Sequence, residues 1–354
     1  MSSAHYQLTD KDLLYYLHIP KTAGMSFTDL LKAHFKPEES SFLEYIGDLV
    51  TRPPEAINKL KAISGHHFYN IDVFTHRVPI YITMLRDPVE RTISYYAFIR
   101  RIPEDSAHDI VKSQSLLEFV TDKRTQYLYA NAQTRYLAAD PNPVEIAKRL
   151  KPNPQNRFEL FEEMQRYAPT GYFDPALLER AKERLRKFAF VGLAEQFDQS
   201  AELLSYTFGW PVIPAPKVFN VSPNRPAPED IPQQVIDIIH ENTQLDAAAY
   251  ETAKELFTAH YNQMLKDQPE KVSQPVVIES DNVAELQRKI AFQKRLIDTL
   301  QEEKLILEER IRTVQKGYES SFGWRFVLRV NKIRLKLIPK GSKIEQFYLK
   351  LRGQ

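Results

Sequence analysis

Short apolar runs alternate with amphipathic segments through the first third of the chain, and this alternation restricts the possible fold more than any other feature. Apolar runs at 13–19, 62–68 and 80–85 have the length of buried strands. The first and third lead directly into helical patterns at 25–35 and 89–100. This order is typical of parallel strands joined by crossover helices. The sequence therefore predicts an α/β fold with a parallel sheet flanked by helices.

The remainder of the first 267 residues completes this domain. A further buried strand is predicted at 188–194, followed by a helix at 196–208 and helices across 233–266. Between 116 and 187 the pattern is helical but broken by prolines, and we expect a lid or acceptor-facing region there. The prolines are Pro141, Pro143, Pro152, Pro154, Pro169 and Pro175.

A linker and a coiled coil are predicted after the domain. Residues 268–282 are polar and proline-containing, which is typical of a linker. Over 283–318, apolar residues are spaced by three and four, once Gln293 and Lys304 are counted in the seam. We expect a coiled coil of about five heptads that joins copies of the chain; a single helix folded onto the domain is the alternative. The apolar seam positions are Val283, Leu286, Ile290, Ile297, Leu300, Leu307, Ile311 and Val314.

The last segment, 319–354, carries the basic charge of the protein. It has nine Lys and Arg against two Glu, a balance of +7, so the net charge of +2 leaves −5 for the rest. Apolar and basic residues alternate at helical spacing behind Trp324. This pattern predicts a basic amphipathic helix in contact with an anionic membrane surface, or else a helix packed on the coiled coil. Because the domain itself is not basic, nucleic acid is not an expected partner.

The absence of cysteine narrows the classes of chemistry that the chain can support. With no cysteine, disulfides, thiolate nucleophiles, Cys-type zinc sites and iron–sulfur clusters are excluded. Residues 1–12 lack the pattern of a secretion signal, and no run approaches the roughly 18 apolar residues of a membrane span. We therefore expect a cytoplasmic protein, peripheral at the inner membrane surface if the tail binds lipid.

The segment His18-Ile-Pro-Lys-Thr-Ala-Gly-Met-Ser26 has the outline of a phosphate-binding turn. It lies between a predicted strand and a predicted helix, where backbone N–H groups and the positive helix end can hold an anion. Gly24 would let the chain approach closely, and Lys21 would add a mobile charge. The turn is P-loop-like but is not a Walker A motif, because the lysine precedes the glycine.

A second segment, Arg86-Asp-Pro-Val-Glu-Arg-Thr-Ile-Ser94, marks the next strand-to-helix junction. Asp87 is a good N-cap, Pro88 suits the first helical position, and Glu90 could complete a capping box. Capping does not explain Arg86 at the strand end or Ser94 two turns into the helix. A guanidinium and a hydroxyl placed in this way could converge on one phosphate.

Together these two segments resemble the sulfotransferases, in particular the branch of the heparan sulfate 2-O- and 6-O-sulfotransferases and their bacterial relatives. The first is similar to the family's 5′-phosphosulfate loop and the second to its 3′-phosphate motif. Further similarity lies at Gly65-His66-His67, 131–137, 191–197 and 245–250, so that the resemblance spans roughly 13–261. Unlike the animal relatives, this chain shows no N-terminal anchor pattern.

The resemblance implies transfer of a sulfuryl group from 3′-phosphoadenosine 5′-phosphosulfate (PAPS) to a hydroxyl, most naturally that of a glycan or glycolipid. In-line displacement at sulfur depends chiefly on positioning and charge stabilisation. Lys21 would neutralise the leaving oxygen, and no metal is required. The 5′-phosphate would be held by Thr22, Ala23, Gly24, Met25 and Ser26, and the 3′-phosphate by Arg86 and Ser94.

A hydroxyl nucleophile needs a general base, and histidine has the appropriate pKa. His66 ends a predicted strand and corresponds to the histidine of the 2-O-sulfating relatives, whereas the 6-O-sulfating relatives point to His67. We expect His18 to pack against or orient the loop. The polar positions Asn131, Gln133 and Arg135 either face the ligands or form a solvated helix face.

Two other functional classes remain open at this point. A nucleotide-dependent phosphotransferase could use the same strand–loop–helix cradle, but it would be expected to carry a Walker-type loop and acidic Mg²⁺ ligands. A non-catalytic assembly protein could carry a degenerate transferase domain beside the coiled coil. The presence of Lys21, His66, Arg86 and Ser94 argues against the second class.

Overall fold

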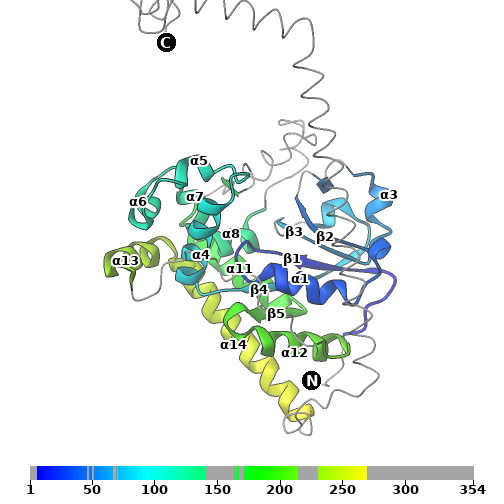
Figure 1. The fold of residues 1–354 in the computed structure, drawn as a ribbon. Coiled ribbons are helices and arrows are strands. Elements are labelled where there is room, and N and C mark those ends of the chain that lie inside the picture. Colours follow the sequence, from blue (N-terminus) through cyan, green and yellow to red (C-terminus); the bar gives the residue numbers. More distant parts are fainter. Residues whose placement is uncertain are drawn as a thin grey trace, which may run out of the picture. The chain divides into compact units, whose positions relative to one another are not determined.

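A five-stranded parallel sheet forms the centre of the computed structural model, with strand order β2-β3-β1-β4-β5 (Figure 1). The structure describes residues 6–45, 48–49, 52–66, 69, 71–140, 163, 165–166, 171–213 and 230–268. The predicted parallel α/β sheet is confirmed, and an edge strand that was not predicted, β2, is added to it. The strands are β1 (Asp12–Leu17), β2 (Ser40–Tyr45), β3 (Ala62–His66), β4 (Val78–Leu85) and β5 (Phe190–Leu193).

Helices cover both faces of this sheet. Phe27 of α1 packs on Tyr16 of β1, with ring centroids 4.8 Å apart. On the opposite face, Arg184 of α11 lies over the Tyr69 ring at 3.9 Å. The helices near the sheet are α1 (Gly24–Lys32), α3 (Pro54–Ile57), α8 (Ala132–Ala138), α11 (Pro175–Lys187), α12 (Phe197–Phe208) and α14 (Gln244–Asp267), with short 3₁₀ turns at η1 (Pro37–Glu39), η2 (Ile71–Phe74) and η3 (Ala194–Gln196).

A second apolar core lies among helices beside the sheet. It is formed by α4 (Pro88–Arg101), α5 (His108–Val111), α6 (Leu116–Thr121), α7 (Gln126–Tyr129) and α13 (Gln233–Asn242). Ile93 and Ile99 of α4 are buried in this core. Arg91 of the same helix reaches the loop after β1, where its Nε donates to the carbonyl of Pro20 at 3.0 Å.

The expected bounds of the domain, linker, coiled coil and tail stay predictions. Pro175 starts α11, with Asp174 as its N-cap, rather than interrupting a helix. The other five prolines of the 116–187 segment lie outside the described residues, as do the predicted coiled coil at 283–318, the basic tail at 319–354 and most of the linker. α14 ends at Asp267. None of the helices that the structure describes is long and apolar enough to cross a bilayer.

Candidate active site

Four strand ends meet at one edge of the sheet, and three of them carry predicted site residues. Because all strands are parallel, their carboxyl ends lie on the same side. β1 leads into the loop 18–23, β3 ends on His66, β4 leads into Arg86, and β5 leads into Glu195. Two distant motifs of the sequence are therefore neighbours here: Arg86 Nη1 donates to the carbonyl of Lys21 at 3.4 Å.

The loop after β1 has an unusual backbone. Lys21 and Ala23 adopt φ values of 72° and 63°, in the left-handed region that non-glycine residues seldom occupy. Gly24 is needed for a different reason, since its own φ is not positive. A Cβ at Gly24 would lie 1.6 Å from Nε2 of His18, so the glycine lets the His18 ring, 4% exposed, pack onto the backbone of α1. The expected packing role of His18 is confirmed.

Four successive carbonyls of this loop, those of residues 18 to 21, each accept a hydrogen bond from a side chain. We call this set of bonds the carbonyl clamp. Because the carbonyls are engaged by the protein, the loop is fixed before any ligand binds. The bonds are His66 Nδ1 to His18 O at 3.0 Å, Thr22 Oγ1 to Ile19 O at 2.9 Å, Arg91 Nε to Pro20 O at 3.0 Å and Arg86 Nη1 to Lys21 O at 3.4 Å.

The amino end of α1 offers backbone donors at the same place. The first helical hydrogen bond runs from Phe27 N to Ala23 O, and Ala23 supplies no side-chain cap. The N–H groups of Gly24, Met25 and Ser26 therefore precede the first intrahelical bond, as at every helix start. Such uncapped N–H groups suit an anion. Ser26 is 5% exposed, and Thr22, fully buried, gives its hydroxyl hydrogen to Ile19.

Lys21 lies along α4. Its Nζ is 4.4 Å from the centre of the Phe98 ring. The pKa of Lys21 is lowered to about 8, chiefly by partial burial and in smaller part by the guanidinium groups of Arg101, Arg86 and Arg91. Because an anion would reverse these effects, the amine is set to gain charge when a phosphate or sulfate binds.

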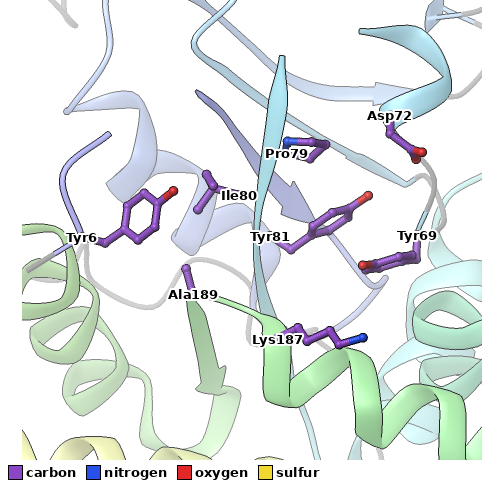
Figure 2. A pocket seen from close by; sticks show the side chains of 8 residues that line it. All are labelled: Tyr6, Tyr69, Asp72, Pro79, Ile80, Tyr81, Lys187 and Ala189. Carbon is purple, nitrogen blue, oxygen red and sulfur yellow. The ribbon is translucent and has the colours of Figure 1, made fainter. Parts of the chain in front are cut away.

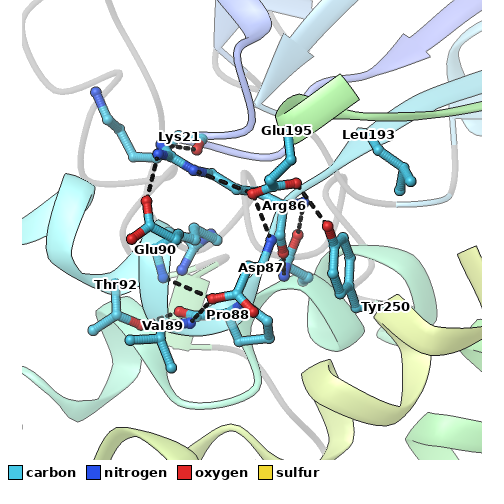
Figure 3. Close-up of polar contacts among 12 residues, drawn as sticks. Lys21, Arg86, Asp87, Pro88, Val89, Glu90, Thr92, Leu193, Glu195 and Tyr250 are labelled. Carbon is cyan, nitrogen blue, oxygen red and sulfur yellow. Dashed lines mark hydrogen bonds and ion pairs between the residues drawn. The ribbon is translucent and has the colours of Figure 1, made fainter. Parts of the chain in front are cut away.

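Arg86 is engaged by two carboxylates in this structure (Figure 3). Its guanidinium lies 3.1 Å from Glu90 and 3.7 Å from Glu195. Glu195 also accepts hydrogen bonds from Asp87 N at 3.0 Å and from the Tyr250 hydroxyl at 2.7 Å. Its carboxylate thus ties the end of β5 to the start of α4, a role that sequence reasoning missed.

Asp87 caps α4 as predicted, accepting from the N–H groups of Val89 and Glu90 at 3.0 Å each, with Pro88 in the first turn. The predicted capping box is wrong. Its second half would need Glu90 to accept from Asp87 N, but Glu195 occupies that donor and Arg86 attracts the Glu90 carboxylate.

Ser94 lies on the face of α4 that carries Arg91 and Phe98, since residues three and four apart share a helix face. Both of those neighbours contact the loop, through Pro20 and Lys21 respectively. Ser94 is 7% exposed. Its place is therefore on the loop side of the helix.

His66 is held in one orientation. Its Nδ1 is 3.0 Å from the carbonyl of His18, and its ring lies 4.3 Å from the His18 ring. A carbonyl only accepts, so Nδ1 carries the proton and Nε2 is the basic nitrogen of the neutral ring. The pKa of His66 is lowered to about 4. Burial is the main cause, the charges of Lys21 and Arg91 act in the same direction, and the bond to the His18 carbonyl opposes them. His67 lies outside the described residues.

A model of the sulfotransferase family matches residues 4–251, well over half of the chain. The chain belongs to the sulfotransferase family. This confirms the resemblance drawn from the two motifs, and it supports sulfuryl transfer as the general reaction. In a direct comparison of sequences, no curated protein matches the chain.

The polar residues of α8 have structural roles in the sulfotransferase domain. Asn131, Gln133 and Arg135 are at most 1% exposed, so the solvated helix face was wrong. Gln133 holds the backbone of Arg86, accepting from its N–H at 3.0 Å and donating to its carbonyl at 2.8 Å. Arg135 donates to the carbonyls of Ala130, Gln165 and Tyr127.

Asn131 and Asp246 cap each other's helices. Asn131 Oδ1 accepts from the N–H groups of Leu245 and Asp246 at the start of α14, at 2.9 and 3.2 Å. The Asp246 carboxylate accepts from the N–H groups of Gln133 and Thr134 at the start of α8, at 3.1 and 2.7 Å. This reciprocal pair fixes α8, and α8 in turn fixes Arg86.

A hollow of about 570 Å³ lies elsewhere in the domain (Figure 2). It is lined by residues that include Tyr6, Tyr69, Tyr81 and Lys187, around the first half of β4. None of the site residues described above lines it. It therefore contributes nothing to the arrangement at the carboxyl edge.

Proposed function

We propose that this sulfotransferase transfers the sulfuryl group of PAPS to a hydroxyl of a carbohydrate-type acceptor, with His66 as the general base. One observation carries the proposal: the carbonyl clamp joins the phosphate-type loop to Arg86 and Arg91 of the second motif and to His66. An anion site and an oriented base are thereby built as a single unit, as an in-line transfer requires.

The residues present fit a doubly phosphorylated donor. The uncapped N–H groups of α1 and the amine of Lys21 suit the phosphosulfate end. Arg86, on the adjoining turn, suits the 3′-phosphate, with Ser94 further along the same helix. Arg86 would exchange its pairing with Glu90 and Glu195 for the phosphate, since a dianion competes well against two partly exposed carboxylates.

Each residue would then act at a stated atom. His66 Nε2 accepts the proton of the acceptor hydroxyl, because its Nδ1–H is engaged with His18 O. PAPS, when bound, supplies the sulfuryl group and leaves as adenosine 3′,5′-bisphosphate. Lys21 neutralises charge that grows on the bridging oxygen, and its lowered pKa gives it scope to strengthen that contact. The loop N–H groups hold the 5′-phosphate throughout.

The proposals for the acceptor, the oligomeric state and the location of the enzyme rest on the sequence alone. The resemblance to glycan-sulfating enzymes favours a sugar hydroxyl, on a glycan or glycolipid. We further propose a homo-oligomer formed through the coiled coil at 283–318, with the basic tail at 319–354 in contact with an anionic membrane surface on the cytoplasmic side.

Two measurements on the full chain test the proposal. Calorimetry should detect binding of adenosine 3′,5′-bisphosphate without Mg²⁺. Incubation with ³⁵S-labelled PAPS and a panel of glycans and small alcohols should label an acceptor. Lys21→Ala and His66→Ala should each remove most of the transfer, and Arg86→Ala should chiefly weaken binding of the bisphosphate.

Matched controls separate these effects from general damage. Lys32→Ala removes an exposed lysine of α1, and His240→Ala removes an exposed histidine of α13; both should transfer at the wild-type rate. A wild-type transfer rate in His66→Ala together with loss of transfer in His67→Ala would assign the general base to His67 instead of His66. Mg²⁺-dependent ATP turnover without use of PAPS would refute the sulfotransferase proposal in favour of phosphoryl transfer.

A further inference from the structure

Arg91 is a buried cation whose charge has no role in the mechanism above. It is 1% exposed, in the second turn of α4. Its Nε donates to the carbonyl of Pro20 at 3.0 Å. Both terminal nitrogens, Nη1 and Nη2, are buried without a hydrogen-bond partner among the described residues. A guanidinium has five donors, so most of its hydrogen-bonding capacity is unmet.

The described protein compensates this charge only in part. Asp246 is the acidic group that acts on Arg91, but its carboxylate is already bonded to two backbone N–H groups, and no ion pair joins the two residues in the described part of the chain. The Tyr95 ring lies 5.4 Å from the guanidinium carbon. Burial lowers the pKa of Arg91, yet an arginine keeps its proton at neutral pH.

An uncompensated buried charge lowers the stability of a folded domain by several kcal/mol. A domain that keeps such a charge is therefore expected to use it for something other than stability. The position of Arg91 suggests the reason. Its positive charge lowers the pKa of both Lys21 and His66, so it lies close behind the two groups that face the reaction. Its Nε holds the Pro20 carbonyl within the carbonyl clamp, four residues before Gly24, the first of the uncapped N–H groups of α1.

We propose that Arg91 is a positioning residue for the anion loop: it turns the Pro20 carbonyl away from the ligand and supplies a fixed positive charge whose counter-ion is the phosphosulfate group of the donor. This rests on the proposed function for the identity of the donor. The proposal gives Arg91 two roles: it fixes the shape of the loop, and it contributes part of the affinity for the donor.

Two substitutions each remove a different part of the proposed role. Arg91→Gln keeps a donor for Pro20 without the charge, and Arg91→Lys keeps the charge without the fork. The full chain is titrated with adenosine 3′,5′-bisphosphate by calorimetry, and its Tm is measured with and without ligand. Both variants should bind about 10- to 100-fold more weakly than wild type, the cost of one charge-assisted interaction. KM for PAPS should rise while kcat at saturation changes little.

The Tm of the ligand-free protein distinguishes this proposal from a merely structural role, because loss of a structural residue would lower that Tm. Arg91→Gln should have a Tm equal to or above that of the wild type without ligand, because a buried charge has been removed. Arg100→Gln, at an exposed position on the same helix, is the control and should leave both measurements unchanged. A lower Tm with unchanged affinity in Arg91→Gln, or wild-type affinity in either variant, would overturn the proposal.

A third arm distinguishes failure of this inference from failure of the proposed function. If the wild type does not bind the bisphosphate, the proposed donor is wrong, and inorganic sulfate and phosphate become the probes. Either ion should then raise the Tm of the wild type and raise that of Arg91→Gln less. Equal increases in the two proteins would reject Arg91 as part of an anion loop.

Discussion

Replacing Gly24 with alanine tests how closely the start of α1 packs against His18 and, through it, against His66. The new Cβ would lie 1.6 Å from His18 Nε2 and 2.1 Å from Cδ2, where ordinary contacts are 3.4–4 Å. The imidazole would therefore have to retreat by about 2 Å, a displacement of the kind for which overpacked cores lose roughly 1–3 kcal/mol. The His18 ring has little room to move, since its centroid lies 5.2 Å from that of the Tyr16 ring and 4.3 Å from that of the His66 ring.

The backbone alone would favour this substitution. Gly24 has a helical φ, and alanine in a helix is better than glycine by about 1 kcal/mol. The steric cost should exceed that gain, so we expect Gly24→Ala to lower the free energy of unfolding by about 1–2 kcal/mol. Transfer should fall as well, because the carbonyl that orients His66 belongs to the displaced residue.

Urea unfolding of four proteins measures the effect: wild type, Gly24→Ala, His18→Ala and the double variant. Removing the imidazole makes room for the new methyl group, so the double variant should be more stable than the sum of the single losses predicts, by at least about 1 kcal/mol. Met25→Ala, at a 45% exposed neighbour, should change stability by less than about 0.5 kcal/mol. A Gly24→Ala protein as stable as the wild type, or additive losses, would refute the packing argument.

Three further outcomes are expected. Asp246→Ala leaves two buried N–H groups of α8 without an acceptor and should lower the free energy of unfolding by about 3–5 kcal/mol in urea titrations; a loss under 1 kcal/mol would contradict the reciprocal caps. Affinity for adenosine 3′,5′-bisphosphate, measured by calorimetry, should decline above pH 8 as Lys21 loses its proton, and Lys21→Arg should abolish that decline. The transfer rate should show no loss near pH 6.5, because the pKa of His66 is lowered to about 4. Replacing Leu300 and Leu307 together by aspartate should reduce the mass found by light scattering; an unchanged mass would remove the coiled coil as the oligomer interface.

The strand ends that carry the site could be predicted from sequence because they are buried on both faces: β1 and β5 throughout, and β4 over its last four residues. These strands contain short apolar runs, and the turns after β1 and β4 were recognised by residue types that suit anions. β2 was missed because its sequence, SSFLEY, has only two adjacent apolar residues, Phe42 and Leu43, and so shows neither an apolar run of strand length nor strict alternation.

The contacts that organise the site could not be predicted in this way, because they depend on partners distant in sequence. Glu195 joins Asp87 and Tyr250, and Gln133 holds Arg86. Local reasoning assigned the α8 side chains to solvent or ligand, whereas they bond to backbone groups that only the fold brings near. Arg91 did leave a signal, as a charge on a helix face otherwise made of Pro88, Ser94 and Tyr95.

The reciprocal caps also bear on the order in which the protein can be made. Asn131 and Asp246 are supplied by helices more than a hundred residues apart, and Gln133 depends on Asp246 for its place. During synthesis, the motif at 86–94 leaves the ribosome long before α14 does. A nascent chain that has not yet extended past Asp246 therefore lacks the cap of α8, the helix through which Gln133 holds the backbone of Arg86.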